Sequence, residues 1–472
     1  MKRLFKWVAA LVIVPILACG LYLAIGLMRS LDPIPQFGTR SPAVLITNVT
    51  VVDVDTGKAL RDVDVHIVNG TIAAIGGVAP DHAKPVETVI DGRGKYLIPG
   101  LWDAHIHTVA LSDRLHFPLM LAAGITSARN MGDGCSWTND LRCSPDRKNW
   151  QKSIQLPTIV ATASYHIEDL DRPADARALV RAIKARGDDM IKVQIEDDPG
   201  ARKFKATVMA SSSEGMSVSG HVPSSANLTE QAFAAFASIE HDTQFMPLCL
   251  RVPQAMCDTL LATLAARRTA YVPTHVASSG QDVALARHAS DQDDLLGFTS
   301  SAISTLWRAY RFIHRSGIDQ ADLVDVKRQH ETALRLTLRA HRAGVTILAG
   351  TDALDPFVLH GESLHDELAY LVRAGLTPVE ALRAATVVPS RLFGRNGETG
   401  KIERGQKADL LLLTKNPLED IAATRSIHSV IANGVIYGPD DREKMRRFVK
   451  RQAASHAVGA RSWWALFRFG AA

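Results

Sequence analysis

The chain has 472 residues, of which 46% are hydrophobic and 22% are charged, and these proportions exclude a disordered or fibrous protein. Fifty-four basic residues exceed forty-nine acidic residues, which leaves a formal net charge of +5, too little over this length to indicate a nucleic-acid partner. We therefore expect one large globular domain with a smaller domain attached to it.

The chain begins with a short basic segment and a long apolar run. Residues 1–6 contain Lys2, Arg3 and Lys6, and residues 7–28 contain no charged side chain. Such a run is long enough to cross a bilayer as a helix, and the basic residues before it keep the N-terminus in the cytoplasm. The pattern predicts a membrane anchor with the body on the extracytoplasmic, periplasmic side. A cleaved signal segment with a secreted body, or a lipoprotein modified at Cys19, are the alternatives.

Four cysteines follow the apolar run in two local pairs. Cys135 and Cys143 form the first pair and Cys249 and Cys257 the second. Spacing alone is equally compatible with free thiols, but an oxidising compartment favours two local disulfides.

The remaining chain divides by pattern. Residues 29–42 contain several prolines and predict a linker. Short β-branched runs separated by turns fill residues 43–96 and 396–438, and they predict one small β-sandwich built from both flanks. Residues 97–395 alternate strand-like runs with amphipathic helices, the α/β pattern of a (β/α)8 TIM-like barrel. The basic, aromatic tail 439–472 predicts either an interfacial helix on the membrane or a helix packed on the body.

The most informative motif opens the barrel region and reads Pro99-Gly-Leu-Trp-Asp103-Ala-His105-Ile-His107. Residues i and i+2 of a strand point to the same side, so His105 and His107 are able to hold one metal ion. The carboxyl end of a barrel strand is also where barrel enzymes keep their chemistry. A His-x-His pair alone is weak support, and the flanking residues make it more specific.

This motif resembles the one that opens the barrel in the amidohydrolase superfamily. Further matches follow in the order expected for that superfamily, at Met-Ile-Lys192-Val, Ser-Gly-His221-Val-Pro, Ser-Ile-Glu-His241 and Ala-Gly-Thr-Asp352-Ala. The Ile-Glu-His segment and the later Gly361-Glu-Ser-Leu-His-Asp-Glu-Leu are similar to the imidazolonepropionase-like and prolidase-like branch, which includes Xaa-Pro and Xaa-Arg dipeptidases. The resemblance covers residues 44–438.

The resemblance implies a centre of two divalent metal ions, with zinc as the expected metal. Six side chains would hold them: His105, His107, Lys192, His221, His241 and Asp352. A lysine ammonium has no lone pair, so the resemblance implies that Lys192 bridges the ions as a carbamate formed with carbon dioxide. Asp352 would be the catalytic residue that moves a proton from water to the leaving nitrogen. Taken singly, Lys192 is also readable as a solvated lysine and Asp352 as a helix N-cap.

Other polar residues lie where barrel loops reach a substrate, and any of them could bind a carboxylate or carbonyl: Arg129, Tyr165, His166, His275 and His360. Related sequences carry Arg-Asp-x-Gly after the second strand, whereas this chain has Asn130 in place of the acidic residue. No role is therefore carried over to an acid at that position.

Together these features predict a membrane-anchored binuclear hydrolase that cleaves a carbon–nitrogen bond with metal-activated hydroxide. The expected substrates are dipeptides, N-acyl amino acids or cyclic amides. The alternatives are a mononuclear deaminase or imidazolone hydrolase, a lactone or phosphotriester hydrolase on the same fold, and a catalytically silent membrane binding protein. The deaminases resemble one another in a His-x-x-Glu after the fifth strand, whereas Ser224 stands three residues after His221 here. The sequence leaves the oligomeric state open.

Overall fold

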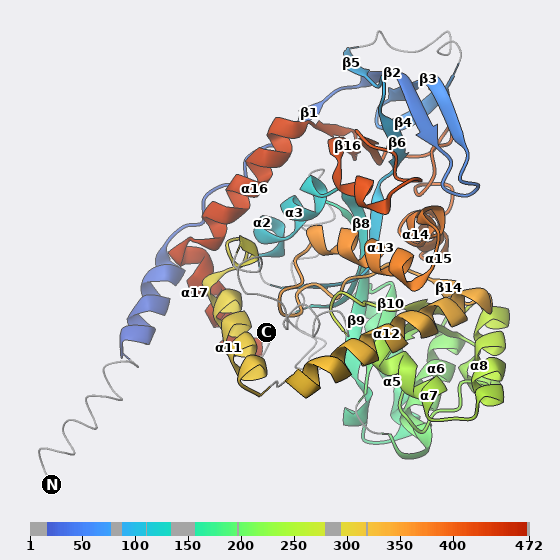
Figure 1. Ribbon diagram of the computed structural model, residues 1–472. Coiled ribbons are helices and arrows are strands. Elements are labelled where there is room, and N and C mark those ends of the chain that lie inside the picture. The colour runs from blue at the N-terminus through green and yellow to red at the C-terminus, as the bar shows by residue number, and fades with distance from the viewer. Residues whose placement is uncertain are drawn as a thin grey trace, which may run out of the picture.

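The computed structural model describes residues 17–76, 87–109, 111–133, 156–195, 198–278, 294–317 and 320–469. A barrel of parallel strands lies at its centre (Figure 1). Eight strands pair in the order β14-β13-β12-β11-β10-β9-β8-β7. Their bounds are β7 Leu101–Thr108, β8 Ile125–Asp133, β9 Thr158–His166, β10 Met190–Gln194, β11 Ser217–Gly220, β12 Phe236–Glu240, β13 Ala270–Val272 and β14 Thr346–Ile347.

The barrel closes between β7 and the segment that follows β14. The backbone N–H of Ala104 donates to the carbonyl of Ala349 at 2.9 Å, and Ile106 forms a parallel bridge with Ala353. The two segments approach so closely that a Cβ added to Gly350 would lie 2.9 Å from the Cβ of His105. Glycine at this position therefore allows the last strand to lie against the first.

Helices surround the strands and bury their apolar faces against them, as in α5, where Leu179, Val180 and Ile183 are buried. Their bounds are α2 Ser112–Leu115, α3 Phe117–Ala122, α5 Ala176–Arg186, α6 Arg202–Glu214, α7 Asp242–Leu250, α8 Gln254–Arg267, α12 Gln320–Arg342, α13 Glu362–Ala374, α14 Pro378–Ala384 and α15 Val387–Leu392. This alternation is the α/β barrel that the sequence predicts.

One of the two expected disulfides lies within the described residues. Cys249 at the end of α7 is bonded to Cys257 in α8, and both are buried. The other predicted pair, Cys135 with Cys143, lies outside the described residues.

The flanks of the barrel pair with each other, as expected, but they form a single hydrogen-bonded sheet of nine strands where the sequence predicted a β-sandwich. Strand β15 pairs antiparallel with β6, and β1 pairs antiparallel with β17. Residues from both flanks, among them Ile46, Ile67 and Leu412, form a core separate from that of the barrel. The strands are β1 Thr39–Arg40, β2 Ala43–Val52, β3 Ala59–Val68, β4 Thr71–Ile75, β5 Thr88–Asp91, β6 Tyr96–Pro99, β15 Leu410–Leu413, β16 Ile427–Ala432 and β17 Val435–Tyr437.

The first and the last described segments of the chain are helical and lie on the same side of the molecule (Figure 1). Residues 17–28 form a helix, and the tail forms α16 Pro439–Ala453 and α17 His456–Phe469. Within the described ranges, the structure contains no helix that is both long and apolar enough to cross a membrane. The predicted anchor, residues 7–28, is only partly covered, because the description begins at residue 17. Helix α16 packs on the body, where Arg442 Nε donates to the carbonyl of Ala122 at 2.7 Å.

Candidate metal centre

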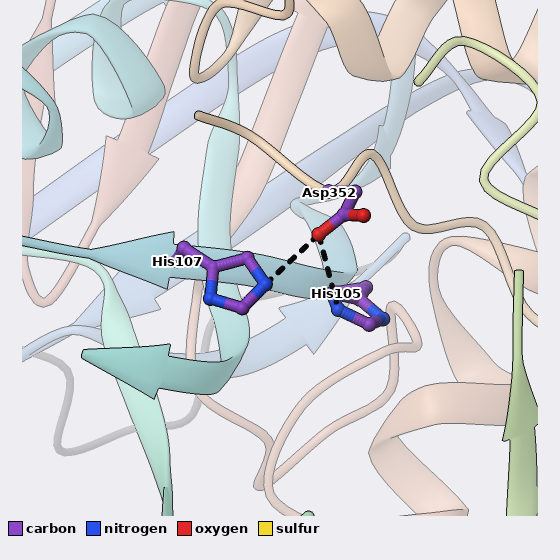
Figure 2. A group of neighbouring side chains, drawn as sticks. All are labelled: His105, His107 and Asp352. Atoms are coloured by element: carbon purple, nitrogen blue, oxygen red, sulfur yellow. Dashed lines mark ion pairs between the residues drawn. The ribbon is translucent and has the colours of Figure 1, made fainter. Parts of the chain in front are cut away.

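Three of the expected ligands meet at the carboxyl end of the barrel strands. His105 and His107 extend from β7, and Asp352 lies on the loop after β14 (Figure 2). Oδ1 of Asp352 is 3.2 Å from Nε2 of His105 and 2.9 Å from Nε2 of His107. The ligand atoms of these three residues lie within 4.8 Å of one another, a spacing that suits a single metal ion.

The other three expected ligands line the same end of the barrel. Nζ of Lys192, on β10, lies 3.4 Å from Nε2 of His105. His241 follows β12, and its Nδ1 lies 3.3 Å from Oδ2 of Asp352. His221 follows β11, and its ring centroid lies 5.2 Å from that of His241. The structure thus brings all six predicted ligands into one cluster.

Burial sets the charge states of this cluster. Burial lowers the pKa of His241 to about 3, and it also lowers the pKa of His221 well below its usual value. Burial of Lys192 lowers the pKa of its amine in spite of the nearby Asp352 carboxylate. Burial opposes the ionisation of Asp352, but His241 and His105 outweigh it and hold the pKa of the carboxyl well below its usual range. Burial therefore favours neutral rings at His221 and His241, beside the anionic carboxylate of Asp352.

A fully buried ion pair between Arg129 and Glu240 orients the ring of His105. Nδ1 of His105 donates to Oε2 of Glu240 at 2.8 Å, and Nη2 of Arg129 donates to both oxygens of Glu240 at 2.8 Å. Arg129 also donates from Nε to the carbonyl of Ala104 at 2.6 Å and from Nη1 to Oγ of Ser238 at 2.9 Å. With the ring proton on Nδ1, as this hydrogen bond assigns it, the lone pair of His105 Nε2 points toward Asp352 and Lys192.

Asp103 fixes the loop that carries Asp352. Its Oδ2 accepts from Oγ1 of Thr351 at 2.7 Å, and its Oδ1 accepts from the backbone N–H groups of Thr351 at 3.0 Å and His105 at 3.2 Å. Burial raises the pKa of Asp103 to about 7. The Asp103 of the Pro-Gly-x-x-Asp-x-His-x-His motif thus links the two ligand-bearing segments.

Three residues expected to reach the substrate lie elsewhere. Arg129 is completely buried inside the barrel, because β8 directs its side chain toward Glu240 and not into a loop. His275 is buried between Asp242 and Thr337, at 2.9 and 3.0 Å. The expected substrate contact is therefore wrong for Arg129 and His275, which have no exposed surface in this structure.

His360 is likewise buried and does not line the site. Its Nε2 donates to the carbonyl of His107 at 3.0 Å, and its ring stacks on His116 with centroids 4.3 Å apart. His360 therefore holds the backbone of β7 at His107, and the expected contact of His360 with the substrate is wrong. Tyr165 and His166 are half-buried at the end of β9, beside Val193 and Gln194 of β10, and their role stays a prediction.

Two acidic residues of the site were given no role from the sequence. Glu240 stands in the Ile-Glu-His segment, and its place on a strand, two residues after inward-facing Ser238, is the signal that would have found it. Asp355 has no sequence signal, and burial together with Asp352 raises the pKa of its carboxyl well above the usual value. Oδ1 of Asn130 accepts from the backbone N–H of Thr108 at 3.1 Å, whereas its buried Nδ2 has no hydrogen-bond partner among the described residues.

The residues of the cluster fit a divalent cation. Oδ1 of Asp352 is buried and accepts no hydrogen bond from any residue in the described part of the chain, although it faces two imidazole nitrogens. Imidazole nitrogens with free lone pairs and an anionic oxygen are the donors that zinc prefers. A cation between them would satisfy the orphaned oxygen and the lone pairs together.

Comparison with known proteins agrees with this fold. The model of the Amidohydrolase family matches residues 96–437, which is most of the chain. The protein therefore belongs to the amidohydrolase family, and it is a metal-dependent hydrolase. An imidazolonepropionase of Rubrobacter xylanophilus is 30% identical over 383 residues, covering 72% of this chain and 82% of that protein.

Adenine deaminase 2 of Rhizobium meliloti is 27% identical over 414 residues, which are 83% of this chain, and the match spans only 56% of the deaminase. Among solved structures, bottromycin amidohydrolase has a TM-score of 0.70 at 24% identity and covers 91% of this chain and 95% of its own. A Xaa-Pro dipeptidase with bound methionine has a TM-score of 0.59 at 22% identity and covers 84% of this chain and 100% of its own. At these identities the structures establish the shared fold alone.

Proposed function

We propose that the protein is a binuclear metal-dependent hydrolase that cleaves the carbon–nitrogen bond of a dipeptide, an N-acyl amino acid or a cyclic amide. The observation that supports the proposal is the position of Lys192. Its Nζ lies 3.4 Å from Nε2 of His105 in a cluster of metal-ligand side chains, and the residue is only 2% exposed. Burying a lysine among histidines costs free energy unless its nitrogen is chemically modified or coordinated, so such a residue indicates a functional role.

Each ligand has a distinct place in this proposal. His105, His107 and Asp352 would hold one ion, and His221 and His241 would hold the other. Burial lowers the pKa of Lys192, so more of its amine is neutral. The neutral amine would form a nitrogen–carbon bond with carbon dioxide and lose one proton, and the resulting anionic carbamate would supply oxygen ligands for the ions. Zinc is the proposed metal because the remaining ligands are imidazole and carboxylate.

The side chains of the site would divide the reaction between them. When bound, two ions would lower the pKa of a shared water and would polarise the scissile carbonyl. Asp352 holds the proton of the attacking water and returns it to the leaving nitrogen, since its carboxylate faces the ligand cluster. Glu240 and Arg129 keep His105 in one orientation during the reaction. Tyr165 and His166, at the end of β9, would orient the substrate.

We also propose that the catalytic body works outside the cytoplasm and is held at the membrane. The Cys249–Cys257 disulfide supports an oxidising compartment. The basic residues 2–6 and the uncharged run 7–28 support an N-terminal anchor with this orientation. A protease-accessibility assay on intact and osmotically opened cells tests the topology, and protection of the body after opening of the outer envelope would contradict it.

A substrate screen tests the proposed reaction. We expect the full chain to hydrolyse members of a dipeptide, N-acyl amino acid and cyclic amide library, to lose this activity after chelation and to regain it with zinc. Asp352→Asn should lower turnover by about 10² to 10⁴, the range of a lost general acid–base. Asp366→Asn is the matched control, because that aspartate pairs with Arg425 on the outside of α13. Hydrolysis that survives complete removal of metal would contradict the proposal. Hydrolytic deamination of adenine, without cleavage of any amide bond in the library, would replace it with the deaminase alternative.

A further inference from the structure

The helix formed by residues 17–28 exposes an apolar stripe on the side that faces away from the body. Leu17, Leu21, Ile25 and Met28 are all exposed, and their spacing places them on one face of the helix. Met28 is the most exposed of them, at 86%. The opposite face contains Gly26, which is buried against α17.

The C-terminal tail fixes this helix in place. Arg461 of α17 donates to the carbonyls of Gly26, Leu27 and Arg29 at 2.9, 3.1 and 2.9 Å, and these carbonyls lie at the end of the helix, where they have no partner within it. His456 Nε2 donates to the carbonyl of Tyr22 at 2.9 Å. A Cβ on Gly26 would clash with Ala460, so the two helices are in close contact. Helix 17–28 and α17 are therefore packed together as one unit.

A second group of exposed apolar side chains lies on the helices next to this unit. Helix α11, Ser301–Gly317, packs against α17, with Gly459 close to Ser301 (Figure 1). Phe312 of α11 is 75% exposed, and Trp464 and Phe467 of α17 are 47% and 66% exposed. We define the terminal surface as the exposed apolar side chains of helix 17–28, α11 and α17.

The three helices carry only positive charges, which favours an anionic partner. Their sequences contain no aspartate or glutamate, whereas α11 has three arginines and α17 has two. The apolar stripe is also the end of the uncharged run that begins at residue 7 and follows the basic residues 2–6. Exposed aromatic residues among arginines are typical of helices that lie in the headgroup region of an anionic bilayer.

We propose that the terminal surface docks the protein body on a lipid bilayer, with α17 and α11 lying in the headgroup region beside the N-terminal helix. The anchor then does not act as a loose tether, because Arg461 joins it to the tail. This inference does not depend on the proposed reaction. It adds a second contact to the proposed N-terminal anchor, made by the distant helices α11 and α17.

Fluorescence quenching of the full chain in vesicles tests the docking. Vesicles of phosphatidylcholine and phosphatidylglycerol whose acyl chains carry bromine quench indoles that enter the bilayer. We expect Trp464→Phe to remove a substantial part of the quenching. The matched control is Trp307→Phe, because Trp307 lies in α11 but is buried. Equal quenching in the wild type and Trp464→Phe would overturn the proposal, since the N-terminal run alone would then explain binding.

Charge substitutions test the same surface independently of any tryptophan. Phe312→Glu combined with Phe467→Glu should weaken partition into these vesicles by roughly tenfold or more, because both aromatic rings lose their apolar contact with lipid. Leu60→Glu and Met209→Glu, at comparably exposed positions on the nine-stranded sheet and on α6, should leave partition unchanged. Partition that is equal in all variants would overturn the proposal. So would a loss of self-association without a loss of vesicle binding, because the surface would then bind a second copy of the chain.

Discussion

Glu240 is the residue whose replacement tests most sharply how the fold prepares the metal centre. It accepts from His105 Nδ1 at 2.8 Å and from Arg129 Nη2 at 2.8 Å, and all three side chains are completely buried. Burial opposes its ionisation, but Arg129 and His105 outweigh burial and hold the pKa of Glu240 well below its usual value. Glu240→Gln keeps the shape and removes the charge. The amide has one acceptor oxygen where the carboxylate has two, so His105 Nδ1 and Arg129 Nη2 would compete for it, and the tautomer of His105 would no longer be fixed.

The expected magnitude follows from two separate losses. Outer partners of a metal-bound histidine typically contribute about 10- to 100-fold to metal affinity, which is about 1.4 to 2.8 kcal/mol. Leaving the Arg129 guanidinium buried without its counter-charge costs about 3 to 5 kcal/mol of folding stability. We therefore expect Glu240→Gln to weaken zinc binding at least tenfold and to lower the midpoint of denaturant unfolding.

Competition with a chromophoric chelator measures the zinc affinity, and denaturant unfolding measures the stability. Glu380→Gln is the matched control, because Glu380 also accepts from a histidine, His341, at 3.0 Å, but on the outside of the barrel. The free energy of unfolding of Glu380→Gln should fall by about 1 kcal/mol or less, and its zinc affinity should stay at the wild-type value. If Glu240→Gln lost stability while its zinc affinity stayed at the wild-type value, Glu240 would not position His105, and the reasoning would be refuted.

Three further predictions concern stability. Burial lowers the pKa of His365 from 6.5 to about 4, so the stability linked to it is full above pH 6.5 and is lost as the pH falls toward 4. In His365→Gln, the loss of unfolding free energy between pH 6.5 and 4 should be smaller than in the wild type by about 3 kcal/mol. Denaturant titrations at a series of pH values measure this loss, and an unchanged pH profile would contradict the prediction. Cys257→Ser should cost about 2.5 kcal/mol, a loss that thiol reductant reproduces in the wild type but not in the variant. Gly350→Ala should lower both stability and metal content, because the added Cβ would lie 2.9 Å from His105, and normal values for both would refute the close packing.

The sequence predicts the barrel from the local alternation of strands and helices, and it predicts the candidate ligands through the resemblance to the amidohydrolase superfamily. The alternation of strands and helices specifies a parallel barrel, and the carboxyl ends of its strands necessarily bring distant residues such as His105, Lys192 and Asp352 together. The pairing of the flanks was also predictable, because β-branched runs before and after the barrel need partners.

The direction of individual side chains was harder to predict. Arg129 was expected at a loop, but it lies on β8 with its side chain inside the barrel. His275 does lie in the turn after β13, but its ring is buried against Asp242 and Thr337. Glu240 was visible in its motif, yet its role depends on a partner 111 residues away in the chain. The contact between Arg461 and the N-terminal helix has no local pattern at all, because it joins residues 435 positions apart.

Counting the metal ions bound per chain tests the central claim most directly. Elemental analysis of the zinc-loaded full chain, prepared with bicarbonate, should give about two ions per chain, the number that a shared-water mechanism requires. Lys192→Ala should bind about one ion or fewer, and its activity should not respond to bicarbonate, because the bridging group is lost. About one ion per chain in the wild type, with neither metal content nor activity affected by Lys192→Ala, would contradict the binuclear account.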